Sequence, residues 1–459
     1  MKSFELKPTP ENLLNTFLED TISRDTDIFR FIDILNSVDD CCSIALDGNW
    51  GCGKTFFVKQ TKMIMDAHNS CITDIDESVR QGIIQKHSNY RPIEELELKP
   101  QICVYYDAWE NDNDEDPMLS LVFSIMKSVD IDYSLKDNPD CLQLGTSVLE
   151  LFTGKNFGQI IEMLRGEDPF AMLKKEKDIH REISKFLDSL MCERGNRLVI
   201  FIDELDRCKP EYAVKLLERV KHYFENDRIT FVFSTNMKEL QHTIRRYYGE
   251  DFNACKYLDR FFDLRLTMPK ADYQKFYTSL NFNNSHYTYD AVCDAVIRTY
   301  HFELREVAKY LKLTKVAAYK ATHGEGYSFS FPEGYGVEFC LLYVLPIMIG
   351  IKIHDLDVYE DFIHGKNYKP LLEVFNNIED GFFNDLLNSS ETFETPDEKQ
   401  KQVSLEEKIK ELYNAIFIKQ YTRTEYRISV GKYLFSRDTR ETLLKVAGLL
   451  SKYTDLSDD

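Results

Sequence analysis

The chain has 459 residues, a length that at ordinary domain sizes predicts two or three domains. Its composition, 43% hydrophobic and 13% aromatic, is typical of a folded globular protein and excludes general disorder. The formal net charge of -20 disfavours direct binding to nucleic acid or to an anionic membrane surface.

The first predicted elements surround a glycine-rich loop. Apolar residues near helical spacing predict helix within residues 12–35, and the apolar run 43–46 predicts a short strand. The loop follows this strand and precedes a predicted helix over residues 56–67. It matches the pattern G-x-x-x-x-G-K-[ST], and its residues are Gly48, Asn49, Trp50, Gly51, Cys52, Gly53, Lys54 and Thr55.

This loop predicts a site for a nucleoside triphosphate with Mg²⁺. The backbone amides of small residues curl around a β-phosphate, and the amino end of the following helix adds positive potential. We expect Lys54 to contact the β- and γ-phosphates and the Thr55 hydroxyl to bind Mg²⁺. Trp50 and Cys52 occupy variable positions of the pattern. We expect packing for the indole, and for the thiol a small filler without a redox function.

Three further apolar runs, at 102–106, 198–202 and 229–233, predict strands of a parallel sheet that is buried on both faces. Helical patterns alternate with them, notably over residues 210–224. This alternation predicts an α/β fold with helices on both faces of the sheet. Residues 111–193 are too many for one crossover, so we expect an inserted helical subdomain that opens with an acidic loop.

Two of the predicted strands end in residues that suit the chemistry of phosphate hydrolysis. Asp203 can hold the Mg²⁺ shell and Glu204 can polarise an attacking water, with Asp206 as the alternative carboxylate. Asn236 follows the other strand, and two interpretations stay open for it. Either its amide lies near the attacking water, or its side chain caps the helix that begins at Lys238.

The chain beyond Pro269 is predicted to be mostly helical. It includes a helix over residues 301–313 and a capped helix that opens with Ser404 and Glu407. The apolar run 339–351 is shorter than the ~20 residues that a membrane-spanning helix needs, so we expect a buried helix there.

We divide the chain into a core over residues 1–268, a helical lid over 269–327 and a helical C-terminal domain of unknown role over 328–459. The N-terminus lacks the apolar segment of a signal peptide. The 11 cysteines are scattered, and no C-x-x-C pair suggests a zinc site or a disulfide framework. Free thiols without an export signal predict a cytoplasmic protein.

Four tracts, in their order and spacing, resemble the KAP family of P-loop NTPases. They are GNWGCGKT at 48–55, VYYDAWEND at 104–112, FIDELDRC at 201–208 and YLDRFFDLRLTMP at 257–269. The resemblance covers about residues 21–327 and implies an ATPase core with a helical lid, related to the AAA+ and STAND-like ATPases. The implied cofactors are ATP and Mg²⁺. GTP is disfavoured because no N-K-x-D motif follows the strands.

The resemblance also implies roles for residues outside the two motifs. Trp109 ends a core strand near the site, with packing in the core as the alternative. Arg305 resembles a lid arginine that senses the γ-phosphate, with a solvent-exposed helix charge as the alternative. Arg260 follows a matching helix and is a further candidate to stabilise phosphoryl charge.

The chain departs from the family pattern in one respect. Many KAP proteins carry transmembrane helices inserted in the P-loop domain, whereas nothing in 111–193 is apolar enough to span a bilayer. We therefore expect a soluble member. Likeness to AAA+ relatives implies that its partners are further copies of the chain or a protein encoded nearby, and likeness to soluble bacterial members implies anti-phage defence.

Three functions are compatible with these residues. The first is ATP hydrolysis that drives a conformational switch or motor. The second is a nucleotide-gated scaffold that assembles with partners and hydrolyses little. The third is a P-loop kinase, which needs an acceptor pocket. The Asp203–Glu204 pair fits the activation of water better than transfer to another acceptor.

Overall fold

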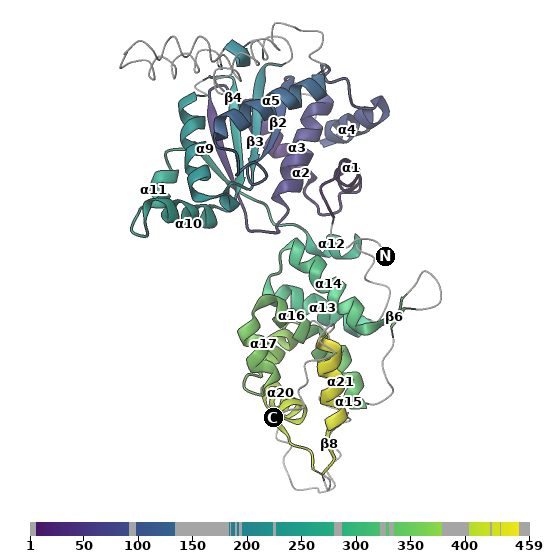
Figure 1. The fold of residues 1–459 in the computed structure, drawn as a ribbon. Coiled ribbons are helices and arrows are strands. Elements are labelled where there is room, and N and C mark those ends of the chain that lie inside the picture. Colours follow the sequence, from purple (N-terminus) through teal and green to yellow (C-terminus); the bar gives the residue numbers. More distant parts are fainter. Residues whose placement is uncertain are drawn as a thin grey trace. The chain divides into compact units, whose positions relative to one another are not determined.

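The computed structural model describes residues 6–90, 98–133, 183, 185–188, 191, 195–223, 226–279, 287–321, 327–329, 335–378, 404–422, 425–431 and 433–448. These residues form two compact units. The first unit comprises Lys7–Asp272, and the second comprises the described residues from Tyr273 onward together with Leu6. Figure 1 colours the chain from purple at the N-terminus to yellow at the C-terminus.

The first unit contains a five-stranded sheet in which every paired strand runs parallel to its neighbour. The strand order is β2-β3-β4-β1-β5. The strands are β1 (Cys42–Asp47), β2 (Gln101–Asp107), β3 (Arg197–Asp203), β4 (Ile229–Thr235) and β5 (Leu264–Thr267). The four predicted strands are therefore present, and β4 separates the strand that precedes the glycine-rich loop from the strand that ends in Asp203.

Helices cover both faces of this sheet, as the sequence predicts (Figure 1). The helices of the unit are α1 (Pro10–Leu18), α2 (Asp25–Ser37), α3 (Lys54–His68), α4 (Glu77–Tyr90), α5 (Pro117–Tyr133), η2 (Leu205–Arg207), α9 (Pro210–Tyr223), α10 (Met237–Tyr248) and α11 (Ala254–Leu258). Residues of α1 to α4 belong to the hydrophobic core on one face, and residues of α5 and α9 to α11 belong to the core on the other face.

The two cores follow from the alternation of side chains along each strand. In β2, Ile102, Val104 and Tyr106 belong to one core, whereas Cys103 belongs to the other. Successive residues of a strand point to opposite faces, so an apolar run without alternation can fill two cores at once. The fold is therefore an α/β fold with a parallel sheet buried on both sides.

The predicted helical insertion at 111–193 lies largely outside the described residues. Its described beginning contains α5, which packs against α9 and β2. Four further described residues of this range are buried in the same core, namely Ile183, Phe186, Leu187 and Met191.

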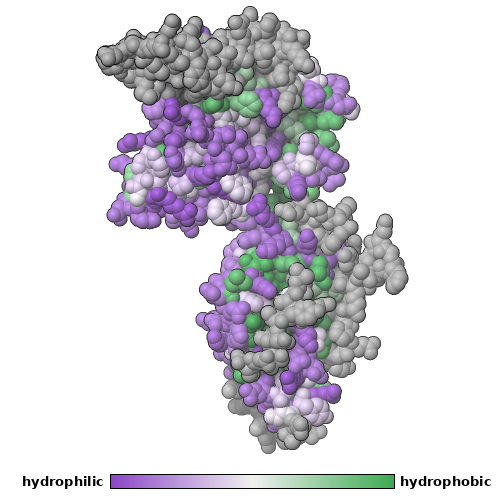
Figure 2. Space-filling model, viewed as in Figure 1, coloured by the Kyte–Doolittle hydropathy of each residue, from purple (hydrophilic) through white to green (hydrophobic). Residues whose placement is uncertain are grey.

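In the view of Figure 2, the described surface over α9 to α11 is mostly hydrophilic.

The second unit is mostly helical, with two short antiparallel hairpins that the sequence analysis does not predict. Its elements are α12 (Tyr273–Ser279), α13 (Tyr287–Tyr300), α14 (Leu304–Ala318), β6 (Tyr319–Ala321), β7 (Tyr327–Phe329), α15 (Tyr335–Phe339), η3 (Cys340–Val344), α16 (Leu345–His354), α17 (Leu356–Ile363), α18 (Lys369–Asn376), α20 (Leu405–Tyr413), η4 (Asn414–Ile418), β8 (Arg427–Val430), β9 (Tyr433–Ser436) and α21 (Arg437–Gly448). The described parts of the predicted lid and C-terminal domain, from Tyr273 onward, belong to this one unit.

A long apolar helical run forms the centre of the second unit. Gly336–His354 is long and apolar enough to cross a membrane by length and composition, but 78% of it is buried inside the structure. The prediction of a buried helix at 339–351 agrees with this burial. The π-helical turn η3 precedes Pro346, whose ring would clash with an α-helical carbonyl four residues earlier.

The predicted capped helix is α20. The Ser404 hydroxyl accepts a hydrogen bond from the Glu407 amide, and the Glu407 carboxylate accepts one from the Ser404 amide. This reciprocal capping box confirms the predicted helix start.

Candidate nucleotide-binding site

The glycine-rich loop connects β1 to α3 at the carboxyl end of the sheet. The Gly48 amide donates a hydrogen bond of 3.2 Å to the Thr235 carbonyl, which attaches the start of the loop to the end of β4. Gly51 and Gly53 have φ angles of 86° and 94°, in the left-handed region that side chains disfavour. Helix α3 begins at Lys54, and because the first amides of an α-helix have no acceptor within the helix, this helix start suits the binding of an anion.

The reactive side chains of the loop contact both the loop and β3. Lys54 Nζ donates to the Gly48 carbonyl at 2.6 Å and to the Asn49 carbonyl at 3.1 Å. The Thr55 hydroxyl donates to Asp203 Oδ2 at 2.7 Å. Thr55 and Asp203 are 148 positions apart in the sequence, yet their side-chain oxygen atoms are neighbours. Oxygen atoms of this kind are the ligands that Mg²⁺ prefers.

Asp203 is the buried last residue of β3. Besides Thr55, the Tyr105 hydroxyl donates to its Oδ2 at 3.0 Å and the Glu204 amide donates to its Oδ1 at 3.1 Å. Burial and the neighbouring Asp203 charge raise the pKa of Tyr105, which therefore stays a hydrogen-bond donor. Sequence reasoning missed Tyr105, although it lies in the quoted tract VYYDAWEND.

Glu204 follows the strand in a left-handed backbone conformation, with φ 60° and ψ 25°. Its carboxylate forms an ion pair with Arg207 Nε. Burial first, and then the adjacent charge of Asp203, raise the pKa of Glu204 to about 7, while Arg207 acts in the opposite direction. A carboxyl group with such a pKa can accept or release a proton near neutral pH, as a general base requires.

Asp206 joins three parts of the site. Its Oδ2 accepts a 2.5 Å hydrogen bond from Trp50 Nε1, and its Oδ1 accepts from the Thr235 hydroxyl at 2.9 Å and the Asn236 amide at 3.2 Å. Both oxygens of this alternative carboxylate are thus engaged. Asp206 connects the glycine-rich loop to the end of β4.

Asn236 is the N-cap of α10. Its side chain accepts hydrogen bonds from the Lys238 and Glu239 amides, at 3.1 and 3.3 Å. This confirms the capping interpretation. The other interpretation, an amide near the attacking water, stays a prediction.

The two tryptophans are both exposed and both lie near Arg207. Trp50 was expected to pack and Trp109 had core packing as an alternative, yet their exposed fractions are 46% and 51%. Both rings instead lie near the Arg207 guanidinium carbon, at 5.8 Å for Trp50 and 5.4 Å for Trp109. The backbone amides of Trp109 and Glu110 both donate to Asp107 Oδ1 at 3.1 Å, which turns the chain after β2 and leaves the indole at the surface. Core packing is therefore wrong for Trp109, whereas Trp50 packs against Arg207 at the surface.

Cys52 is buried, as expected for a filler. Its carbonyl accepts a 2.6 Å hydrogen bond from Arg24 Nη1, while Arg24 Nη2 donates to the Pro269 carbonyl at 2.6 Å. Arg24 is only 2% exposed and was not singled out from the sequence, because a single arginine before a helix carries no recognisable signal.

The two arginines inferred from the family resemblance are both exposed. Arg260 is exposed after α11, and its carbonyl accepts a hydrogen bond from Lys221. Arg305 is exposed near the start of α14, in the second unit. The structure thus brings together the glycine-rich loop, Asp203, Glu204 and Asn236, whereas the roles of Arg260 and Arg305 stay predictions.

Three comparisons with known proteins show what the chain is similar to. Residues 24–294, more than half of the chain, match the family model of the KAP family P-loop domain. An uncharacterized protein, MJ0182, of Methanocaldococcus jannaschii is 25% identical over 173 residues, which cover 28% of this chain and 87% of that protein. The ORC2 protein of Aeropyrum pernix, solved in ADPNP-ADP complexes, is a structural match with a TM-score of 0.30 and 15% identity. That match covers 63% of this chain and about half, 55%, of the other.

Proposed function

Because the chain belongs to the KAP family of P-loop NTPases, we propose that it binds ATP with Mg²⁺ and hydrolyses it. The hydrogen bond of 2.7 Å between the Thr55 hydroxyl and Asp203, with Glu204 as the next residue, carries this proposal. Thr55 and Asp203, which we propose as Mg²⁺ ligands, and Glu204, which we propose as the general base, thus belong to one cluster of side chains.

Lys54 and the loop amides bind the triphosphate in this proposal. Lys54 Nζ already lies against the Gly48 and Asn49 carbonyls, so it is held at the loop and can exchange these acceptors for phosphate oxygens. A charge-assisted hydrogen bond to phosphate is stronger than one to a neutral carbonyl, which favours the exchange.

Thr55 and Asp203 would hold the magnesium ion. Held there, the ion would supply positive charge against the negative charge that develops on the phosphate oxygens during hydrolysis. The Tyr105 hydroxyl and the Glu204 amide fix the orientation of the Asp203 carboxylate, so this ligand needs little reorganisation.

Glu204 would orient the attacking water and accept its proton. Its partly buried position beside Asp203 makes it more basic than an ordinary glutamate. The proton then resides on a Glu204 carboxylate oxygen, and the site is reset when this proton is released to solvent. Coupling of turnover to a conformational switch or motor is part of the same proposal.

Steady-state turnover and nucleotide binding test this function together. We expect Glu204→Gln to lower kcat by about a hundredfold or more while a fluorescent ATP analogue still binds, because a general base contributes roughly 10²–10⁴ in rate. Lys54→Ala is expected to abolish binding. Glu211→Gln is the matched control, since Glu211 is exposed on α9 and forms an ion pair with Lys215 of the same helix.

Two results would count against the proposal. Turnover that survives Glu204→Gln, while Lys54→Ala still abolishes binding, would show that the base is misassigned. Wild-type protein that binds ATP with no turnover would instead support the nucleotide-gated scaffold.

A further inference from the structure

Arg207 occupies a position that the proposed function does not yet use. It ends the short helix η2, three residues after Glu204, and its Nε forms an ion pair with Glu204 Oε2. Both side chains are partly buried, so solvent screens this pair less than it screens pairs on an open surface. The guanidinium is thus a direct neighbour of the carboxylate that we propose as the general base.

Two aromatic rings hold the guanidinium of Arg207. Its Cζ lies 5.8 Å from the centroid of the Trp50 ring and 5.4 Å from that of the Trp109 ring. Both distances are within the range of cation–π attraction, and indole is the aromatic group that cations prefer. The planar guanidinium can contact a ring and a carboxylate at the same time, which an ammonium does less well.

The three neighbours of Arg207 come from three different segments. Trp50 belongs to the glycine-rich loop and is anchored through its Nε1 to Asp206. Trp109 follows β2 and is oriented by the turn at Asp107. Glu204 follows β3. Arg207 therefore joins the phosphate-binding loop to the end of the strand that carries the base.

We propose that Arg207 is a positioning residue. Its ion pair fixes the Glu204 carboxylate, and its contact with Trp50 transmits the state of the glycine-rich loop to that carboxylate. Only the expected effect on kcat rests on the proposed ATP hydrolysis. The linkage between the loop and Arg207 can be measured in a protein that binds nucleotide without hydrolysing it.

The kinetic test compares Arg207→Met with Arg207→Lys. We expect the methionine variant to lower kcat by about tenfold to a hundredfold, because small misplacements of a reacting group cost up to about 10²-fold. The KM for ATP should change by less than about twofold, since the proposed phosphate contacts come from Lys54 and the loop amides and not from Arg207. Lysine restores the charge and should recover part of kcat, which a role limited to folding would not predict.

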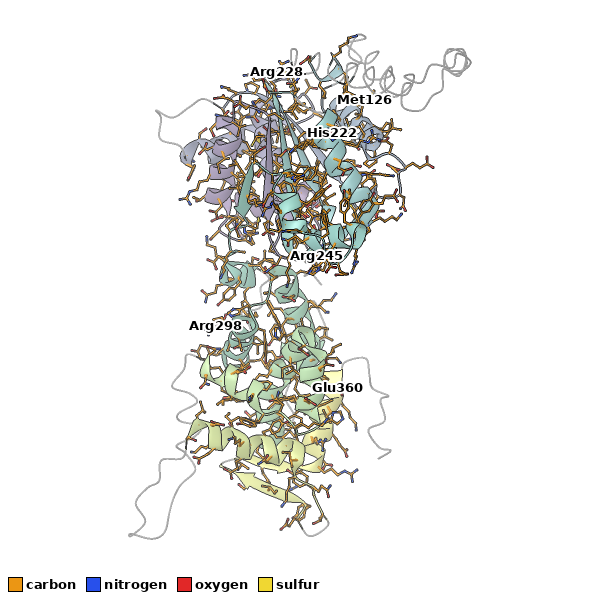
Figure 3. All side chains as sticks on the ribbon, turned by 90° about the vertical axis from the view of Figure 1, so that its left-hand side faces the viewer. Met126, His222, Arg228, Arg245, Arg298 and Glu360 are labelled. Carbon is orange, nitrogen blue, oxygen red and sulfur yellow. The ribbon has the colours of Figure 1, made fainter. Side chains whose placement is uncertain are left out.

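Arg228→Met is the matched control for this substitution. Arg228 forms an ion pair with Asp188 at 3.0 Å and immediately precedes β4, at the amino ends of the strands. Figure 3 shows Arg228 at the end of the first unit that lies away from Arg245 of α10. Its substitution should leave kcat and KM at wild-type values, and thermal melting of each variant monitors folding.

Tryptophan fluorescence provides a readout that does not need turnover. The chain contains two tryptophans, and both flank Arg207, so selective excitation reports on this cluster. We expect a non-hydrolysable ATP analogue with Mg²⁺ to change the emission of the wild-type protein. This change should be lost or at least halved in Arg207→Met at saturating analogue, and Trp109→Phe identifies the part that comes from Trp50.

The kinetic and fluorescence tests together distinguish a failure of this inference from a failure of the proposed function. Loss of the fluorescence change in a folded Arg207→Met protein that still binds the analogue supports the linkage even if the wild type shows no turnover. A wild-type kcat together with an unaltered fluorescence change in Arg207→Met would overturn it.

Discussion

The Asp203 carboxylate accepts hydrogen bonds from three separate parts of the chain, namely the Thr55 hydroxyl, the Tyr105 hydroxyl and the Glu204 amide. Each donor comes from a different position along the chain, at the start of α3, in β2 and after β3. A buried carboxylate needs such partners, because an ion without them would be costly to remove from water. The same bonds that stabilise the fold also orient the ligand for a cation.

The contact between two histidines, His87 and His68, predicts how the stability of the first unit depends on pH. His87 of α4 lies with its Nδ1 2.9 Å from His68 Nε2 of α3, and both rings are within the first unit. Burial first, and then the neighbouring His68, lower the pKa of His87 to about 4 from an ordinary value of 6.5. The folded protein therefore binds fewer protons at this residue than the unfolded chain between these two pH values.

Stability should consequently fall as the pH falls from about 6.5 towards 4. For His87 alone, the free energy of unfolding should decrease by about 2 kcal/mol between pH 7 and pH 5. Chemical denaturation at the two pH values measures this difference. It should shrink in His87→Phe and persist in His364→Gln, whose histidine is exposed on the second unit. A wild-type pH dependence that His87→Phe leaves intact would contradict this assignment.

At the scale of elements, Arg24 connects three segments of the first unit. It precedes α2, and its guanidinium donates to carbonyls in the glycine-rich loop and at Pro269, after β5. The Asp272 amide also donates to the Ile22 carbonyl at 3.2 Å. The chain that leaves the sheet towards the second unit is thereby attached beside the phosphate-binding loop.

Replacing Arg24 should destabilise this arrangement. Arg24→Met removes the donors to the carbonyls of Cys52 and Pro269, and each buried acceptor left without a partner costs roughly 1–3 kcal/mol. We expect the free energy of unfolding of the first unit to fall by about 2–4 kcal/mol and nucleotide binding to weaken. Arg30→Met, within α2, is the control, because Arg30 is 69% exposed and its ion pair with Asp27 is long, at 3.8 Å. Equal unfolding free energies for the two variants would refute this role of Arg24.

The main elements of the first unit could be predicted from local sequence, whereas their order in the sheet could not. Apolar runs at 43–46, 102–106, 198–202 and 229–233 correspond to β1 to β4 because a strand buried on both faces needs a continuous apolar sequence. Strand β5 was missed because it lies at the sheet edge and is mostly exposed, so it lacks such a run. The place of β4 between β1 and β3 depends on tertiary packing, which periodicity does not report.

The candidate site was predictable to a similar degree. The motifs locate Lys54, Thr55, Asp203 and Glu204 because the chemistry of phosphate binding restricts both residue type and spacing. The contacts of Tyr105 and Arg24 could not be predicted, because their partners Asp203 and Cys52 are distant in sequence. The partner of Arg207 is only three residues away, but this ion pair depends on the side-chain conformation, which the sequence does not give. The exposed positions of the two tryptophans likewise depend on Asp206 and Asp107, whose bonds cannot be read from local sequence.

At the scale of the whole molecule, the sequence divides into an α/β unit and a mostly helical unit. The second unit buries the apolar run Gly336–His354, and the Tyr310 hydroxyl of α14 donates to the Pro346 carbonyl in α16 at 3.1 Å. This bond links the region predicted as a lid to the region predicted as a separate C-terminal domain. Hairpins β6–β7 and β8–β9 escaped prediction because strands of three or four residues are too short to show a period.

A crystal structure with Mg²⁺ and a non-hydrolysable ATP analogue tests the central claim most directly. We predict that the phosphates lie within the loop of residues 48–55, and that one metal ion contacts the Thr55 hydroxyl with the Asp203 carboxylate beside it. Phosphates bound elsewhere, or an Asp203 carboxylate turned away from the metal ion, would contradict the account.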